Sequence, residues 1–315
     1  MRAGYAFWHH GRVEIDVPRP LVNAVVRRMG MKREAAMPDP EAYALWESRR
    51  DIVVPHTPPR AAVRACTVNV REHAGWPSYD VRPRRRVSRA AIVYIHGGGY
   101  IGEISPFHWY LIGALLRPTG ASAIVPIYPL APTGSAESTV PEVADLIAEV
   151  IAERGAEHVI VMGDSAGGGL AVAAAMHLRD TGRVLPHRLV LISPWLDVTS
   201  SDPRIREIEP RDAMLAYPGL IRAGKGWAGG IEVTDPRVSP LYGELAGLPP
   251  MTVFTGTNDL LHPDALNFAD KAAAVGSLDV DLHIEPGAQH VYPLMPVREG
   301  RRARRLMVEL LRSVG

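Results

Sequence analysis

The chain has 315 residues, 47% of them hydrophobic and 22% charged, which is typical of a globular protein and excludes a disordered or fibrous one. Its 35 Lys and Arg residues and 34 Asp and Glu residues leave a net charge of +1, so no overall field attracts nucleic acid or an anionic membrane. The single cysteine, Cys66, excludes an internal disulfide and favours a reducing, cytoplasmic location.

Residues 1–55 precede the first expected strand. Their first 13 residues lack the apolar stretch of a secretory signal, so we expect no signal peptide. Helical patterns follow at 21–29 and 41–50, and we expect the whole segment to act as a cap that closes a pocket. Five bulky apolar side chains are available for this purpose, namely Trp8, Leu21, Val25, Met29 and Trp46.

From about residue 63 onward, short apolar runs alternate with helical patterns, which predicts strands joined by crossover helices in a mostly parallel sheet. Several runs are apolar throughout, so helices are expected on both faces of the sheet. The most apolar segment, 170–178, is too short to span a bilayer. The expected strands are 91–95, 123–127, 159–162, 189–192, 251–254 and 280–284. The expected helices include 106–116, 165–179, 263–275 and 298–311.

Two further features belong to this alternation. The spacing of Thr139 and Glu142 is that of a capping box, which predicts that the helix before strand 159–162 begins there. Residues 199–235 form a long segment rich in proline, glycine and charge between two expected strands. Loops of that length in compact domains are usually functional, so we expect this segment to be a second part of the cap.

The segment Gly163–Gly167 reads G-D-S-A-G directly after an apolar run and before an alanine-rich helical pattern. This is the G-x-S-x-G motif in the strand, turn and helix context of a nucleophile elbow. The glycines are needed because the serine takes strained backbone angles and larger side chains would collide with the strand and the helix. The motif predicts Ser165 as a nucleophile at a helix N-terminus, where N–H groups favour developing negative charge.

A second motif, H-G-G-G at 96–99, also follows an apolar run. Three successive glycines leave backbone N–H groups uncovered, as an oxyanion hole requires, and HGGG is the oxyanion motif of lipases and esterases. The expected oxyanion donors are the amides of Gly98, Gly99 and Ala166. His96 precedes the serine in the chain, so we expect it to make structural hydrogen bonds rather than to act as the base.

A serine hydroxyl needs a base to take its proton, and in chains with this motif the acid and the histidine follow the serine. His290 lies in the loop after expected strand 280–284, and Asp259 lies in the loop after expected strand 251–254. Asp264 begins the next helix, so we expect it to cap that helix. No group of His, Asp and Glu has the spacing of a zinc site, and the chemistry needs no metal or other cofactor.

The ordered set of motifs resembles the hormone-sensitive-lipase-like branch of the α/β-hydrolases. The resemblance covers the chain from about residue 65 to its end, and the motifs that carry it are HGGGY at 96–100, YPLAP at 128–132, GDSAGGGLA at 163–171, SPWLD at 193–197, DPRVSPL at 235–241 and GTND-L at 256–260. It implies an α/β-hydrolase catalytic domain at 56–315 with a helical cap. It also implies hydrolysis of small or short-acyl esters through an acyl-enzyme, with Ser165, Asp259 and His290 as the triad.

The resemblance further implies that Tyr100, Asp164 and Trp195 bind the substrate, and it makes a homodimer plausible. Two alternatives stay open at the level of sequence. An amidase, formamidase or lactonase would use the same triad, and a non-catalytic ligand-binding relative would share the fold. The second alternative is weaker because such relatives normally lack a triad residue, whereas this chain has candidates for all three.

Overall fold

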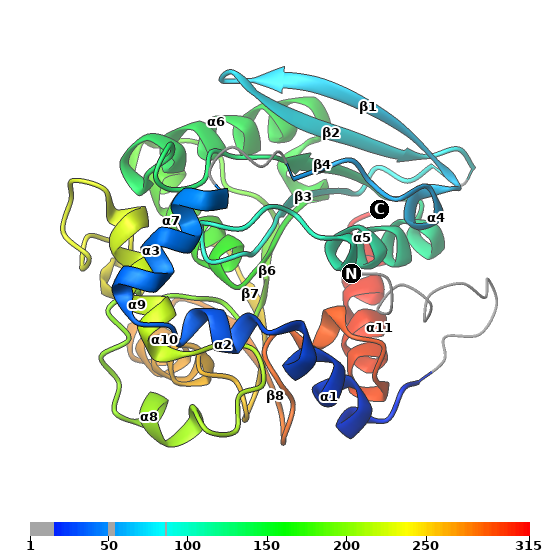
Figure 1. Cartoon of the computed structure of the whole chain (residues 1–315). Coiled ribbons are helices and arrows are strands. Elements are labelled where there is room, and N and C mark those ends of the chain that lie inside the picture. Colours follow the sequence, from blue (N-terminus) through cyan, green and yellow to red (C-terminus); the bar gives the residue numbers. More distant parts are fainter. Residues whose placement is uncertain (1–15, 50–53, 86) are drawn as a thin grey trace.

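In the computed structural model, which describes residues 16–49, 54–85 and 87–315, one eight-stranded sheet forms the centre of the molecule (Figure 1). Its strand order is β1-β2-β4-β3-β5-β6-β7-β8. Strand β2 pairs antiparallel with β1 and with β4, and all other neighbours are parallel. The strands are β1 Cys66–His73, β2 Trp76–Pro83, β3 Ala91–Ile95, β4 Ser122–Pro126, β5 Val159–Asp164, β6 Arg188–Ile192, β7 Met251–Gly256 and β8 Val280–Glu285.

Helices cover both faces of the sheet, because the central strands are apolar on both sides. In β3, Val93 and Ile95 contribute to one core while Ile92 and Tyr94 contribute to the other. The first core is covered by α6 Ala136–Arg154, α7 Ala166–Asp180 and α10 His262–Val275. The second is covered by α4 Arg60–Val63, α5 Pro106–Thr119 and α11 Arg298–Ser313.

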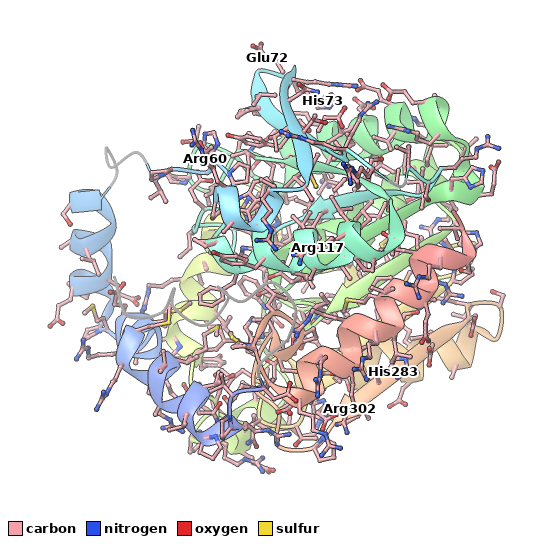
Figure 2. All side chains as sticks on the ribbon, turned by 90° about the vertical axis from the view of Figure 1, so that its right-hand side faces the viewer. Arg60, Glu72, His73, Arg117, His283 and Arg302 are labelled. Carbon is pink, nitrogen blue, oxygen red and sulfur yellow. The ribbon has the colours of Figure 1, made fainter. Side chains whose placement is uncertain are left out.

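Figure 2 looks onto the second face, where α5, which carries Arg117, packs beside α11, which carries Arg302. The mostly parallel sheet with helices on both faces confirms the fold class expected from the alternating pattern. Within the described ranges, no helix combines the length and the apolar composition that crossing a bilayer requires.

The antiparallel hairpin of β1 and β2 was not predicted from the sequence. The two strands are joined by Ala74 and Gly75, which have φ angles of 49° and 83°, as a tight two-residue hairpin turn requires. Strand β1 lies at the edge of the sheet and exposes most of its side chains, so its sequence has no apolar run. The pattern that identified the buried strands is therefore absent from this one.

The start of α6 was also predicted wrongly. The helix begins at Ala136, one turn before the expected capping box, and Ser135 is its N-cap. The Ser135 side chain accepts a hydrogen bond from the amide of Ser138. Thr139 is completely buried inside the helix, so its spacing to Glu142 has no capping role.

The two segments expected to form a cap contact each other. The N-terminal segment forms α1 Arg19–Met29, α2 Met31–Ala35 and α3 Asp39–Arg49, and the later segment contains α8 Arg204–Ile208 and α9 Tyr217–Ala228. Arg222 of α9 is buried and donates hydrogen bonds to the carbonyls of Ala35 and Met37. The domain boundary at residue 55 stays a prediction. The hydrogen bonds of Arg222 show that the N-terminal segment and the segment 199–235 pack against each other.

The expectation that apolar side chains of the N-terminal segment close a pocket is wrong for three of the five. Leu21, Val25 and Met29 are 58%, 41% and 51% exposed on one side of α1, whereas Val22 and Val26 pack against the core. Trp8 and the side chain of Trp46 lie outside the described residues. The side chains of Leu21, Val25 and Met29 therefore face outward from the protein in this structure instead of covering a pocket.

Parallel strands place their carboxyl ends at one edge of the sheet. From β3 the chain continues to β4 on one side of it, and from β4 it crosses to β5 on the other side of β3. The direction in which successive strands are added to the sheet therefore reverses at β3. In open α/β sheets, ligands bind at such a switch point, beyond the carboxyl ends of the strands. The loops that follow β3 and β5 therefore meet where a binding site is expected.

Candidate active site

The turn between β5 and α7 holds Ser165 in a strained conformation, with φ 53° and ψ −124°. A Cβ atom on Gly167 would lie 2.1 Å from the carbonyl oxygen of Ile95, and one on Gly163 would lie 2.3 Å from the carbonyl oxygen of Gly167. The amide of Ser165 donates to the carbonyl of Ile192 at 2.8 Å. The glycines thus allow the tight turn that the motif predicts, and the turn places Ser165 at the N-terminus of α7.

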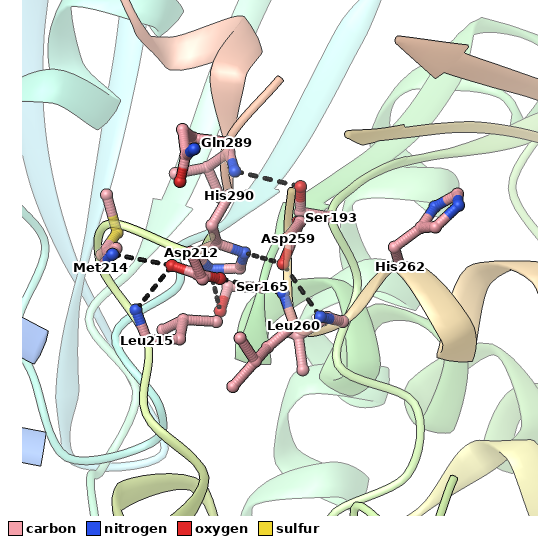
Figure 3. Close-up of polar contacts among 12 residues, drawn as sticks. Ser165, Ser193, Asp212, Met214, Leu215, Asp259, Leu260, His262, Gln289 and His290 are labelled. Atoms are coloured by element: carbon pink, nitrogen blue, oxygen red, sulfur yellow. Dashed lines mark hydrogen bonds and ion pairs between the residues drawn. The ribbon is translucent and has the colours of Figure 1, made fainter. Parts of the chain in front are cut away.

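The structure brings Ser165, His290 and Asp259 together from the loops that follow β5, β8 and β7 (Figure 3). Nε2 of His290 lies 3.0 Å from Oγ of Ser165, and Nδ1 of His290 lies 3.0 Å from Oδ1 of Asp259. All three side chains are buried, Ser165 being 7% exposed. A nucleophile, a base and an orienting acid require this order of contacts.

The protonation of His290 is set by opposing effects. Burial disfavours the charged imidazolium and by itself lowers the pKa of His290. The charge and hydrogen bond of Asp259, followed by the charges of Asp212 and Asp164, outweigh burial, so the pKa of His290 is raised above its ordinary value. The imidazolium that would form when His290 accepts a proton is therefore stabilised by this site.

The HGGG loop lies beside Ser165. Gly98 has a φ of 131°, and a Cβ atom there would lie 2.2 Å from the carbonyl oxygen of Gly102. The amides of Ile101 and Gly102 donate to the carbonyl of Gly98, which closes the turn. Within the described part of the chain, the amides of Gly98 and Gly99 have no backbone acceptor. They are available to a ligand, as the expected oxyanion role requires.

Asp164 fastens this loop to the elbow. Its carboxylate accepts hydrogen bonds from the hydroxyl of Tyr94 at 2.8 Å and the amide of Gly97 at 3.1 Å, and Oδ2 lies 3.1 Å from Nε2 of His108. Burial raises the pKa of Asp164, but His108 and these hydrogen bonds outweigh burial and lower it. With its carboxylate occupied by protein partners, Asp164 is placed to position the loop rather than to contact substrate, contrary to the sequence expectation.

The other two expected substrate-binding side chains are also enclosed by protein. The ring of Tyr100 stacks on that of Trp227 with centroids 4.0 Å apart and on that of Trp195 with centroids 5.6 Å apart. Tyr100 is 1% exposed, Trp195 is completely buried, and the Trp195 indole donates to the carbonyl of Asp197. All three rings are buried, so direct contact of Tyr100 or Trp195 with substrate is not supported.

His96 has the surroundings of a structural histidine. Its ring is buried and stacks on Tyr128 with centroids 4.6 Å apart, and Nδ1 lies 2.7 Å from the carbonyl oxygen of Gly97. Burial lowers the pKa of His96 to about 4, so the ring is neutral at pH 7. Its place is beside the glycine loop and not at Ser165, where His290 lies.

Asp264 does not cap its own helix as expected. Its Oδ2 accepts hydrogen bonds from the amides of Leu196 and Asp197, each at 3.0 Å, and so holds the loop that follows β6. Asp212, which lies in the segment 199–235 and close to Asp259 and His290, was not predicted from the sequence (Figure 3). Asp264 is 68 residues from Leu196, and Asp212 is 48 residues from Leu260, from whose amide it accepts a hydrogen bond. Contacts over such distances leave no local pattern in the sequence.

Among the described residues, no group of three or more His, Cys, Asp and Glu side chains is arranged to hold a metal ion. The side chains of Ser165, His290 and Asp259 form a hydrogen-bonded chain, and the amides of Gly98 and Gly99 have no backbone acceptor in the described part of the chain. Such an arrangement can activate a hydroxyl and stabilise an oxyanion.

Comparisons with known proteins agree with this geometry. A model of the alpha/beta hydrolase fold matches residues 92–294. An acetyl-hydrolase of Streptomyces hygroscopicus is 35% identical over 242 residues, which are 74% of this chain and 78% of that protein. A triacylglycerol lipase of Mycobacterium tuberculosis (strain ATCC 25618 / H37Rv) is 41% identical over 187 residues, which are 59% of this chain but 38% of the lipase.

A solved structure shows the same relationship over the whole length. The crystal structure of an esterase from the bacterial hormone-sensitive lipase family has a TM-score of 0.78 and 26% identity, and the match covers 94% of this chain and 98% of that one. The family resemblance drawn from the motifs is therefore confirmed. The chain belongs to the α/β-hydrolase fold family and, within it, to the hormone-sensitive-lipase-like esterases and lipases.

Proposed function

We propose that the protein is a serine carboxylester hydrolase that cleaves small or short-acyl esters through an acyl-enzyme. Neutral His290 takes the proton of Ser165 while Oγ attacks the ester carbonyl, and Asp259 fixes the imidazole and stabilises the imidazolium. The amides of Gly98, Gly99 and Ala166 donate to the oxyanion. His290 then protonates the departing alcohol, and a water molecule repeats the same steps on the acyl-enzyme to release the acid.

The observation that carries this proposal is the pair of 3.0 Å contacts that His290 makes with Ser165 and Asp259. A non-catalytic relative would have no need to keep a buried serine, histidine and aspartate in this order. The names of the relatives, acetyl-hydrolase and triacylglycerol lipase, support ester bonds as the target.

The size of the acyl group is a finer part of the proposal. The low exposure of Ser165 supports a small substrate, as does the likeness to an acetyl-hydrolase. The likeness to a triacylglycerol lipase points toward longer chains. Its matched part is well under half of that lipase, so the acetyl-hydrolase is the better guide.

A series of p-nitrophenyl esters from acetate to decanoate, together with lactones and anilides, tests the reaction and the substrate size. We expect kcat/KM to be highest for the acetyl or butyryl ester. A decanoyl ester that is cleaved faster than the butyryl ester would contradict a short-acyl pocket, and faster cleavage of an anilide or lactone would contradict the ester preference. A phosphonate or sulfonyl fluoride should label Ser165 alone, as peptide mass spectrometry can check.

The homodimer and the cytoplasmic location stay predictions of the sequence. Light scattering on the purified protein tests the first. For the second, the relevant feature is the single cysteine, Cys66, which is buried and cannot form a disulfide within the chain. Fractionation of the cells that make the protein would test the location directly.

A further inference from the structure

Asp212, between α8 and α9, reaches the triad from outside the motifs (Figure 3). Its side chain is completely buried. Oδ1 accepts hydrogen bonds from the amides of Met214 at 2.7 Å and Leu215 at 2.8 Å, and Oδ2 accepts one from the amide of Leu260 at 2.9 Å. The first two contacts belong to a local turn. The third joins this turn to the residue that follows Asp259.

The loop that carries Asp259 is thereby held by two carboxylates. The amide of Leu260 donates to Asp212, whereas the next amide, that of Leu261, donates to Oδ1 of Asp259 at 2.9 Å. That same oxygen lies 3.0 Å from Nδ1 of His290. Oδ2 of Asp259 is buried and has no hydrogen-bond partner among the described residues. The orientation of the Asp259 carboxylate therefore depends on Oδ1 and on a correctly placed backbone.

The turn at Asp212 is also tied to the loop of the base. The side chain of Gln289 accepts a hydrogen bond from the amide of Ala213 at 2.7 Å and donates one to the carbonyl of Arg211 at 3.1 Å. Gln289 immediately precedes His290. The turn from Arg211 to Leu215 thus contacts the acid loop through Asp212 and the base loop through Gln289.

The N-terminal segment holds this turn from the other side. Nζ of Lys32, on α2, donates hydrogen bonds to the carbonyls of Glu209 and Asp212, the second at 2.7 Å. Residue 212 is therefore fixed twice, at its carbonyl by Lys32 and at its carboxylate by three amides. A side chain from the first 35 residues thus contacts the turn that orients the acid and base loops.

We propose that Asp212 is a positioning residue for the proposed ester hydrolysis, which keeps the Asp259 and His290 loops aligned, and that Lys32 holds it in place. The inference rests on the function proposed above. It goes beyond the triad because the Asp212 carboxylate accepts its hydrogen bonds from backbone amides, those of Met214, Leu215 and Leu260. Its effect passes through Leu260 and through its negative charge.

The charge gives Asp212 an effect that a simple turn residue would lack. Three carboxylates raise the pKa of His290 against the effect of burial, namely those of Asp259, Asp212 and Asp164. Burial, together with the charge of Asp259, raises the pKa of Asp212 itself to about 6. Both carboxylate oxygens accept hydrogen bonds from backbone amides, as those of an ionised carboxylate do, and the negative charge stabilises the imidazolium. Removing that charge should make His290 easier to deprotonate.

The test is Asp212→Asn in the full chain, assayed with p-nitrophenyl butyrate across pH. The asparagine oxygen can keep the contacts with Met214 and Leu215, but its amide nitrogen would face the N–H of Leu260, donor against donor. We expect kcat to fall about 10- to 100-fold, with a smaller change in KM, because the acid loop shifts. The acid limb of kcat/KM should move to lower pH, by about half a pH unit or more, because His290 loses a neighbouring charge.

Asp197→Asn is the matched control. Asp197 is also buried, and its carboxylate accepts the amide and hydroxyl of Thr199. This variant should lose thermal stability without moving the acid limb. If Asp212→Asn instead keeps kcat and the acid limb of the wild type, Asp212 is only a turn residue and the inference is wrong. Absence of ester hydrolysis in the wild-type protein would overturn the proposed function itself, which is a different outcome.

A second variant, Lys32→Met, keeps the inference testable if Asp212→Asn does not fold. It removes the hydrogen bonds to the carbonyls of Glu209 and Asp212 and leaves the Asp212 side chain unchanged, so we expect kcat to fall about 3- to 10-fold. Lys271→Met is its control, because Nζ of Lys271 also holds two loop carbonyls, those of Leu241 and Gly243. Equal kcat values in the two lysine variants would refute the role of Lys32.

Discussion

The two halves of the candidate site are built in different ways. The nucleophile half, residues 96–100 and 163–167, is shaped by glycines whose missing side chains let backbone segments approach within contact distance. The acid–base half, which consists of the loops of Asp259 and His290 with the turn at 209–215, is held by side chains from distant parts of the chain. Local steric constraints make the first half readable from a short motif. The second half depends on long-range hydrogen bonds, which leave no such pattern.

The largest expected effect comes from the nucleophile half. Ser165→Ala removes the atom that we propose forms the acyl-enzyme, and in a comparable triad loss of the serine costs about 10⁶-fold in kcat. The fold should survive, because the elbow depends on the glycines and on the backbone contact with Ile192. Stopped assays with p-nitrophenyl butyrate and a thermal melt would measure both. A variant that keeps more than a few per cent of the activity would exclude Ser165 as the nucleophile.

In the acid–base half, Asp259→Asn is the substitution that changes the contact with His290 most directly. The amide no longer holds the productive tautomer of His290, and we expect a loss of about 10⁴-fold in kcat, by analogy with the same substitution in a serine protease triad. Asp264→Asn, assayed side by side, is the control, since Asp264 contacts the loop after β6 and not His290. Near-normal turnover of Asp259→Asn with collapse in Asp264→Asn would reverse the two assignments.

A smaller loss of kcat is expected when the shape of the HGGG loop is changed and Ser165 is left in place. Gly98→Ala would place a Cβ atom 2.2 Å from the carbonyl oxygen of Gly102, so the HGGG loop must move and its oxyanion donors move with it. Loss of one such donor costs about 10²- to 10³-fold in kcat, and we expect a fall of this size. Gly182→Ala is the matched control, because Gly182 also has a positive φ, 68°, but open space around it. Similar kcat values for the two variants would mean that the loop does not form the oxyanion hole.

The difference between short motifs and long-range contacts also explains which features could be predicted from the sequence. The parallel strands could be predicted because buried strands are apolar throughout. Ser165, Asp259 and His290, which the structure brings together, could be selected because the motifs place their loops at strand ends. Asp212 was missed because its partner, Leu260, is 48 residues away and offers only a backbone amide, which every residue but proline has. Tyr100 and Trp195 were assigned to substrate from resemblance, whereas in the structure the ring of Tyr100 stacks on those of Trp195 and Trp227, both far along the chain.

The smallest effect concerns stability and distinguishes Asp259, in the acid loop, from Asp264, in the first turn of α10. Burial, and then the charge of Asp197, raise the pKa of Asp264 well above its ordinary value. A carboxyl group with a raised pKa in the folded state binds its proton more tightly there than in the unfolded chain, so its contribution to stability is lost as the pH rises toward that pKa. Asp264→Asn has no proton to lose and should escape this loss.

The melting temperature of Asp264→Asn minus that of the wild type should therefore increase from pH 5 to pH 8. Asparagine can keep an oxygen toward the amides of Leu196 and Asp197, so turnover should stay within about threefold of the wild type, because neither reacting atom moves. Thermal melts of both proteins in the same buffers measure the difference directly. A difference that stays flat or decreases with pH would mean that Asp264 is ionised throughout. Its two backbone contacts would then be those of a charged anchor, and the acid–base half would hold one more permanent charge beside Asp259.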